Sequence, residues 1–119
     1  MTATTDDAAL TQVLRKTILT LVRRHEADLT SRQFGVFLTV YLTAAPHTVR
    51  GLAATLNVAK PVITRALDRL GELDLAQRKV DPMDRRSVLV QQTRAGDAFL
   101  AELRHVMTSV GTENLNAAA

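Results

Sequence analysis

Apolar residues recur at three- and four-residue spacing in the first part of the chain, the pattern of an amphipathic helix. The stripe consists of Leu10, Val13, Leu14, Ile18, Leu21 and Val22. It predicts a helix over residues 7–26. A second helix is predicted to begin at Thr30, because Thr30 and Gln33 form a capping-box pattern, and to stop before Pro46.

The centre of the chain predicts two short helices joined by a tight turn. The first covers residues 50–56, and the second begins near Lys60 and ends near residues 73–74. Asn57 suits the turn because it tolerates a positive φ, and Pro61 suits a first helical turn because its missing N–H would be unpaired there. Two crossing helices would bury Leu52, Leu56, Val58 and Ile63 between them. This helix-turn-helix pattern holds its second helix where it can enter a DNA major groove.

Two segments that look like strands follow, the second of them β-branched, and they predict a hairpin, or wing. Residues 75–80 and 87–91 form the predicted strands, and the charged, turn-rich segment 81–86 joins them. A last helix is predicted over residues 94–113 behind the cap Thr93, with Phe99, Leu103, Val106 or Met107, and Val110 at helical spacing. The expected fold is mainly α with a small β-hairpin. It is a winged helix-turn-helix with long N- and C-terminal helices, in one domain over residues 1–119.

Composition narrows the functional classes. The chain has no cysteine, which excludes disulfides, thiolate catalysis and zinc–thiolate sites. No apolar run approaches the ~18 residues of a membrane span, and no signal peptide is recognisable, so we expect a cytoplasmic protein. We expect neither an enzyme nor a cofactor, because no catalytic triad, carboxylate pair or phosphate loop is identifiable. No metal site is expected, since His25, His47 and His105 lack partners at metal spacing.

Positive charge concentrates in the segment that holds the helix pair and the hairpin. Residues 50–94 contain nine basic residues against five acidic ones, whereas the remainder contains six against seven. A polyanion partner would explain this asymmetry. A solvated face of mixed charge would explain it equally well, so charge alone does not decide the partner.

Four stretches of the chain carry a more specific pattern. They are Thr-Val-Arg-Gly-Leu-Ala at residues 48–53, Val-Ile-Thr-Arg-Ala-Leu-Asp-Arg-Leu at 62–70, Asp-Pro-Met-Asp-Arg-Arg-Ser at 81–87, and Thr-Arg-Ala-Gly at 93–96. Together they resemble the MarR family of winged-helix transcription regulators over roughly residues 30–103. The helix pair alone is moderately specific, but Asp-Pro-x-Asp-Arg-Arg at the right distance behind it is a strong signal. The chain departs from the family pattern at Asp74, where glycine is usual, at Gln92, where leucine is usual, and by stopping at Ala119 without a further helix.

The resemblance implies a homodimer joined by the first and last helices, with a reader helix in the major groove and the wing in the adjacent minor groove. The implied DNA-binding residues are Lys60, Pro61, Thr64, Arg65, Arg69, Asp84, Arg85 and Arg86, with Asp84 orienting the wing arginines. The implied dimerisation residues are Leu10, Leu14, Ile18, Leu21, Phe99, Leu103, Val106 and Val110. The resemblance would also allow a small aromatic acid to bind as an effector between the dimer helices and the reader.

Several of these residues have plainer interpretations. Arg65 could be a solvated residue paired with Asp68, three residues further on. Asp81 and Asp84 could suggest a metal loop, but two carboxylates are too few ligands for calcium. The aromatic residues of the second helix fit core packing better than a ligand cradle; they are Phe34, Phe37 and Tyr41.

We therefore expect a dimeric transcription regulator, a repressor, that binds a pseudo-palindromic operator in double-stranded DNA. The alternative is a winged helix used for protein–protein contact, such as a co-regulator or anti-repressor, because a fold does not determine a function. Retention on heparin or random duplex DNA at low salt, with release as salt rises, distinguishes the two.

Overall fold

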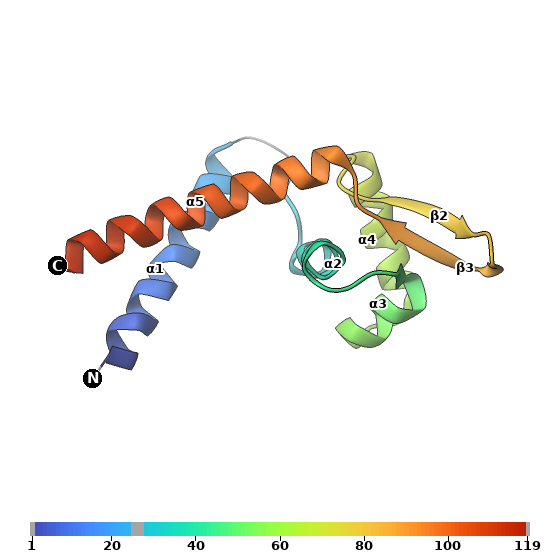
Figure 1. Ribbon diagram of the computed structural model, residues 1–119, viewed down its shortest axis with the longest axis horizontal. Coiled ribbons are helices and arrows are strands. Elements are labelled where there is room, and N and C mark those ends of the chain that lie inside the picture. Colours follow the sequence, from blue (N-terminus) through green and yellow to red (C-terminus); the bar gives the residue numbers. More distant parts are fainter. Residues whose placement is uncertain (1, 25–27, 119) are drawn as a thin grey trace. The chain divides into compact units, whose positions relative to one another are not determined.

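The computed structural model describes residues 2–24 and 28–118, with side chains at 7–24, 28–109 and 111. The elements are α1 (Thr2–Arg23), α2 (Ser31–Leu42), β1 (His47–Thr48), α3 (Val49–Leu56), α4 (Lys60–Glu72), β2 (Gln77–Asp81), β3 (Asp84–Gln91) and α5 (Arg94–Ala118), all labelled except β1 in Figure 1. The chain forms two compact units. One is Leu29–Phe99; the other joins Met1–Asp28 with Leu100–Ala119.

The Leu29–Phe99 unit has the predicted winged helix-turn-helix fold. Its antiparallel sheet has the order β1-β3-β2, so that β3 is central. Directly paired residues share a face of the sheet, which places Arg78 with Val90 and Val80 with Val88 on one side. Val90 is buried, and this face of the wing therefore turns toward the helices at its root.

The second strand of the hairpin is longer, and the turn tighter, than the sequence predicts. The predicted strand over residues 75–80 is wrong at its start, because β2 begins at Gln77 and the two residues before it, Leu75 and Ala76, are buried core residues. The predicted loop over residues 81–86 shrinks to Pro82 and Met83, since β3 already begins at Asp84. Charged residues fit within these strands because the outer half of the hairpin is exposed.

Two aspartates explain how so short a turn is held. The carboxylate of Asp81 accepts the backbone N–H of Met83 at 2.9 Å. The carboxylate of Asp84 accepts the backbone N–H of Arg86 at 3.1 Å. Both are local side-chain-to-backbone bonds of the kind that aspartate favours in turns.

The predicted helix boundaries hold where a cap was recognised. Thr30 and Gln33 form the reciprocal capping box that starts α2, with N···O distances of 2.9 and 3.1 Å. Asn57 ends α3 with a φ of 56°, and Asp74 follows α4 with a φ of 57°. Aspartate thus takes the left-handed position that glycine usually occupies.

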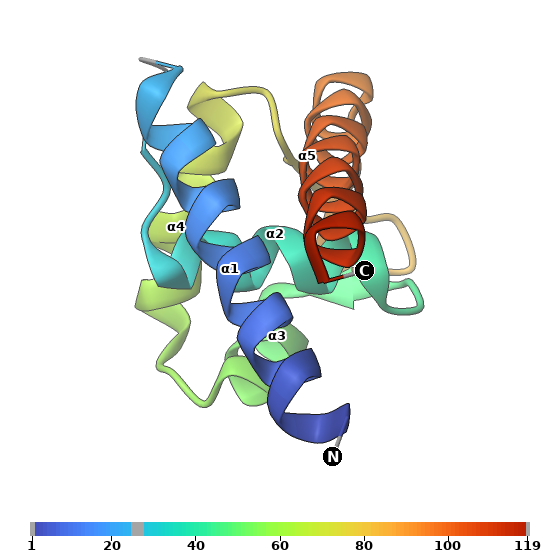
Figure 2. The ribbon, with the colours of Figure 1, turned by 90° about the vertical axis from the view of Figure 1, so that its left-hand side faces the viewer.

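Three helices differ from their predicted bounds. α3 begins one position early, at Val49, because the Thr48 hydroxyl accepts a backbone N–H and caps the helix there. α1 reaches back to Thr2 and is described as far as Arg23, and the predicted end at residue 26 lies outside the described residues. α5, seen nearly end-on in Figure 2, continues unbroken to Ala118, beyond the predicted end at residue 113.

An aromatic cluster sits in the core of the Leu29–Phe99 unit. The ring centroid of Phe37 lies 4.4 Å from that of Tyr41 and 5.3 Å from that of Phe99. The rings of Phe34 and Phe99 lie 6.2 Å apart. The favoured core interpretation of the α2 aromatics is therefore correct. The largest fully buried side chains of the unit are Phe37, Leu52, Ile63, Leu70, Val36 and Val40.

The Tyr41 hydroxyl makes a polar joint at the edge of this cluster. It donates to the carbonyl oxygen of Leu75 at 2.7 Å and accepts the backbone N–H of Thr93 at 2.9 Å. The Thr93 hydroxyl in turn accepts the backbone N–H of Gly96 at 2.9 Å, which caps the start of α5. A Cβ at Gly96 would lie only 1.7 Å from the Tyr41 oxygen and 2.6 Å from the Leu75 oxygen, so no larger residue fits.

We expect Gly96→Ala to lower the free energy of unfolding by about 1–3 kcal/mol, because the added methyl group must displace Tyr41 or the backbone of Leu75. Gly71→Ala is the matched control. Gly71 is also helical, but the nearest atom beyond its own helix turn would lie 3.9 Å from an added Cβ, so alanine should raise stability by up to about 1 kcal/mol. Urea unfolding followed by circular dichroism measures both. Equal stability of the two variants would contradict the close packing of Gly96 against Tyr41 and Leu75.

Candidate nucleic-acid interface

α4 separates its residues cleanly into two faces. One face is buried and consists of Ile63, Ala66, Leu67 and Leu70. The opposite face is exposed and polar, and includes Lys60, Pro61, Thr64, Arg65 and Asp68. The 3.6-residue period of the helix produces this division, and the exposed face is the one that a helix-turn-helix presents to a partner.

Asp68 does not neutralise Arg65, contrary to the plainer interpretation of the sequence. Asp68 Oδ1 accepts a hydrogen bond from Arg78 Nη2 of β2 at 2.5 Å. Arg65 Nε donates instead to the carbonyl oxygen of Pro61 at 3.3 Å, one turn earlier in α4. The Arg65 side chain therefore keeps its positive charge on the exposed face, without a carboxylate partner among the described residues.

A groove runs between the helix pair and the wing. It is lined by Thr48, Val49, Arg50, Lys60, Thr64, Arg78, Asp84, Arg86, Ser87 and Val88. The groove brings together four of the predicted DNA-binding residues, which are Lys60, Thr64, Asp84 and Arg86. It adds Arg50 and Arg78, which the sequence analysis did not select. The alternation of β2 could have placed Arg78 on the inner face of the wing, but the register of the hairpin is needed to see this.

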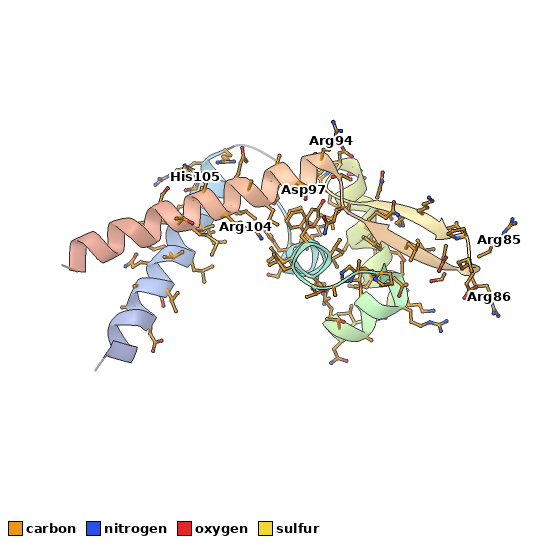
Figure 3. All side chains as sticks on the ribbon, viewed as in Figure 1. Arg85, Arg86, Arg94, Asp97, Arg104 and His105 are labelled. Atoms are coloured by element: carbon orange, nitrogen blue, oxygen red, sulfur yellow. The ribbon has the colours of Figure 1, made fainter. Side chains whose placement is uncertain are left out.

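The wing ends in a pair of arginines. Figure 3 shows Arg85 and Arg86 at the tip of the hairpin, directed away from the helices. Arg86 is 95% exposed, and its Nε lies 3.6 Å from Asp84 Oδ1, the same oxygen that accepts its backbone N–H. Asp84 thus bonds to the backbone of Arg86 and lies within ion-pair distance of its side chain, while its role in orienting the wing arginines stays a prediction.

The remaining predicted contacts lie outside this groove. Arg69 forms an ion pair with Glu72 at 2.8 Å, three residues on, near the end of α4. Arg65 borders a separate shallow hollow, where the start of α2 contributes Arg32. Arg32 is therefore a second basic residue that the sequence analysis missed, since it belongs to a helix selected only for its apolar face.

The predicted dimerisation residues differ in their exposure. Along α1, Leu10, Leu14, Ile18 and Val22 are 67%, 62%, 46% and 60% exposed. Leu21 and Val106 are half-buried and Leu103 is buried, while the side chain of Val110 lies outside the described residues. Phe99 packs within the Leu29–Phe99 unit, so the exposed apolar surface comes from α1 and, on α5, from Met107.

Neither a metal site nor a membrane span is present in the part of the chain that the structure describes. No three side chains of metal-ligating type gather within it. None of its helices is both long and apolar enough to cross a bilayer.

Comparison with known sequences decides the family. Residues 18–87 match the sequence model of the MarR family. The chain belongs to the MarR family. Members of this family are transcription regulators, and this protein is therefore a transcription regulator with a winged-helix fold, as its sequence motifs indicate. No curated protein is significantly similar to the chain.

Solved structures have the same fold. The YusO protein of Bacillus subtilis is 19% identical over 92% of this chain and 75% of its own, with a TM-score of 0.73. A mutant MarR of E. coli is 26% identical over 97% and 79%, with a TM-score of 0.66. The transcriptional repressor CouR, solved with a 23-mer DNA duplex, is 26% identical over 92% and 74%, with a TM-score of 0.68.

The exposed arginine at the wing tip leads to a prediction about DNA binding. Arg86→Ala should weaken binding to duplex DNA and make the slope of log K against log salt shallower by about one unit, because one phosphate contact is lost. Arg94→Ala is the matched control: it removes the same charge at the start of α5, away from the wing tip in Figure 3, and should leave the slope unchanged.

Asp84→Ala tests whether Asp84 orients Arg86, because loss of that contact and loss of the negative charge should change DNA affinity in opposite directions. The substitution removes a negative charge from the groove, which by charge alone should improve DNA binding. We expect weaker binding, because Arg86 loses both its backbone and its side-chain contact. Fluorescence anisotropy with labelled duplex measures the change, and tighter binding would leave charge repulsion as the role of Asp84.

Proposed function

We propose that this protein recognises a specific sequence in double-stranded DNA and represses transcription there. The observation that carries the proposal is the groove between the helix pair and the wing. It joins the exposed face of α4, at Lys60 and Thr64, to a wing that ends in Arg86. Polar reading groups on a helix, beside basic groups on a hairpin, suit the bases of a major groove and the phosphates next to it.

In this proposal α4 enters the major groove and reads bases. Thr64 and Arg65 lie one turn beyond the start of the helix, where recognition helices meet base edges. The Arg65 guanidinium would donate to the O6 and N7 atoms of guanine, the commonest specific contact of arginine in this groove. Lys60 and Pro61 stand at the helix start, close to the expected path of a phosphate backbone.

The wing would follow the adjacent minor groove. Its tip carries Arg85 and Arg86, and a narrow minor groove has an enhanced negative potential that attracts arginine. Arg69 would contribute less than the others, because Glu72 already offsets its charge. Arg50 and Arg32 add positive charge on either side of α4 and extend the surface available to phosphates.

We further propose a homodimer that places two reader helices on one pseudo-palindromic operator. Four exposed apolar side chains recur every four residues along α1, and a monomer rarely leaves such a stripe in water. The terminal helices, predicted at residues 7–26 and 94–113, would form the two-fold interface. Half-sites would then lie about 34–36 Å apart, one turn of DNA. A cytoplasmic location and a small aromatic effector between dimer helices and reader remain predictions.

Selection from random duplex DNA tests the proposal directly. The purified protein should enrich a pseudo-palindrome, and transcription in vitro from a promoter that overlaps this site should fall when protein is added. CouR, described as a transcriptional repressor bound to a DNA duplex, supports the repressor role by similarity. Failure to enrich any sequence, together with no retention on heparin at low salt, would favour the protein-contact module instead.

Arg65→Ala tests base reading. The variant should lose about 1–3 kcal/mol of binding free energy for the selected site and less for random duplex, because a base contact discriminates between sequences. Arg69→Ala is the control on the same helix, since its charge is already paired. Equal losses on selected and random DNA would mean that Arg65 contacts phosphate and does not specify sequence.

Leu14→Ser combined with Ile18→Ser tests the dimer without disturbing a core, because both side chains are exposed. The double variant should sediment as a monomer at micromolar concentration and bind a full site poorly, while its α-helical content stays unchanged. Leu42→Ser removes an equally exposed apolar residue from α2 and should leave the dimer intact. A wild-type protein that sediments as a monomer would contradict an interface formed without DNA.

A further inference from the structure

We propose that Asp68 and Arg78 form a strut that sets the angle of the wing against the reader helix, so that Asp68 promotes DNA binding although its charge opposes it. The inference rests on the proposed DNA-binding function and adds two positioning residues to it. Neither residue needs to touch a base. Their role is to hold α4 and the wing tip in one fixed relation.

The strut is a direct bond between two elements. Asp68 lies on the exposed face of α4, and Arg78 lies on β2 at the root of the wing. Arg78 Nη2 donates to Asp68 Oδ1 at 2.5 Å, a short charge-assisted hydrogen bond. Their side chains are 38% exposed for Arg78 and 55% exposed for Asp68, so solvent screens the pair. An ion pair this exposed adds little to the stability of the fold, and its effect is mainly on geometry.

The position of Arg78 along β2 explains how one side chain can control the angle of the wing. Arg78 shares the inner face of the wing with Val80, Val88 and Val90. Val90, opposite Arg78, is buried, whereas Val80, one step nearer the tip, is 54% exposed. Among the described residues, the wing therefore loses its support from the helices just beyond Arg78.

A small rotation at this point would move the tip a long way. A strand rises about 3.3 Å per residue, so the turn lies roughly 10 Å beyond Arg78. If the wing rotated by about 20°, the turn would move by roughly 3–4 Å, more than the length of a hydrogen bond. Arg86 could not keep a phosphate or minor-groove contact while α4 stayed seated in the major groove.

Removal of the Asp68 charge distinguishes repulsion of DNA from positioning of the wing, because the two roles predict opposite changes in DNA affinity. A free carboxylate on the exposed face of α4 would repel the phosphates of DNA, and its removal should tighten binding. A carboxylate that positions the wing should weaken binding when it is removed. Asp68→Asn keeps the size of the side chain and removes its charge, so it separates the two explanations.

We expect Asp68→Asn to bind the selected duplex about fivefold to tenfold more weakly than wild type, a loss within the range of couplings between residues in contact. Glu72→Gln is the matched control, since it also removes one exposed acid of α4 that pairs with an arginine of the same helix. It should bind as tightly as wild type or more tightly. Asp68→Arg combined with Arg78→Asp should recover most of the affinity that either single variant loses, because the bond is rebuilt with its charges exchanged.

Footprinting on the same duplex adds a readout that a general loss of folding would not give. In Asp68→Asn, protection of guanine N7 by α4 in the major groove should persist, while protection of the sugars by the wing in the minor groove should be lost. Binding by Asp68→Asn that equals or exceeds that of Glu72→Gln would overturn the strut. Loss of both protections together, or no recovery in the exchanged pair, would overturn it as well.

A measurement without DNA separates the strut from the proposed function. The chain has no cysteine, so Met83→Cys at the wing turn and Thr55→Cys on α3 can carry spin labels at two unique positions. The distance distribution between the labels should be narrow in the otherwise unchanged protein and broad when Asp68→Asn is added. An unchanged width would reject the strut whether or not the protein binds DNA. A broadened width in a protein that enriches no DNA sequence would reject the function and keep the strut.

Discussion

One hydroxyl group, that of Tyr41, holds both ends of the wing. Leu75 precedes β2 and Thr93 follows β3, and the Tyr41 oxygen bonds to the backbone of both. The ring beneath it packs on Phe37 in the core, so the hydroxyl cannot follow a displaced backbone. Gly96 must be a glycine for the same reason, since the start of α5 passes directly over that oxygen. The hairpin is therefore anchored to the core at its root, whereas the side chains around its tip are exposed.

This division explains why the outer wing relies on aspartates. The tip has no core to pack against, and Asp81 and Asp84 instead tie its turn to the backbone. The strut of Asp68 and Arg78 would act between the anchored root and the free tip. A wing built in this way has a rigid base and a fixed turn, and the strut would set the angle at which the turn meets a DNA groove. Repulsion from the carboxylates would be the electrostatic cost of this geometry.

Local chemistry let the sequence predict most of the fold, whereas the site depends on contacts between distant residues. The Thr30 and Gln33 capping box, the left-handed Asn57 and the proline at the start of α4 each act within a few residues, and all appear as predicted. The predicted wing turn was too long. Charged residues in exposed strands have the same polar sequence pattern as a loop. The pairing of Asp68 with Arg65, which the sequence left open as an alternative, does not form. A pair three residues apart is visible in the sequence, but Arg78 reaches Asp68 only through the register of the hairpin, ten positions away.

The acidic residues of segment 50–94 have structural roles that its net charge does not reveal. Residues 50–94 contain five acidic residues, and four of them make bonds through their side chains. Asp68 and Glu72 neutralise Arg78 and Arg69 close to the helices, which leaves Lys60 and Arg65 as the basic groups on the exposed face of α4. The fifth acid, Asp74, supplies a left-handed backbone position. The acids thus leave net positive charge where a duplex would meet the protein and remove it where none is needed. For this reason the direction in which DNA affinity changes when each acid is neutralised says more about the site than the net charge does.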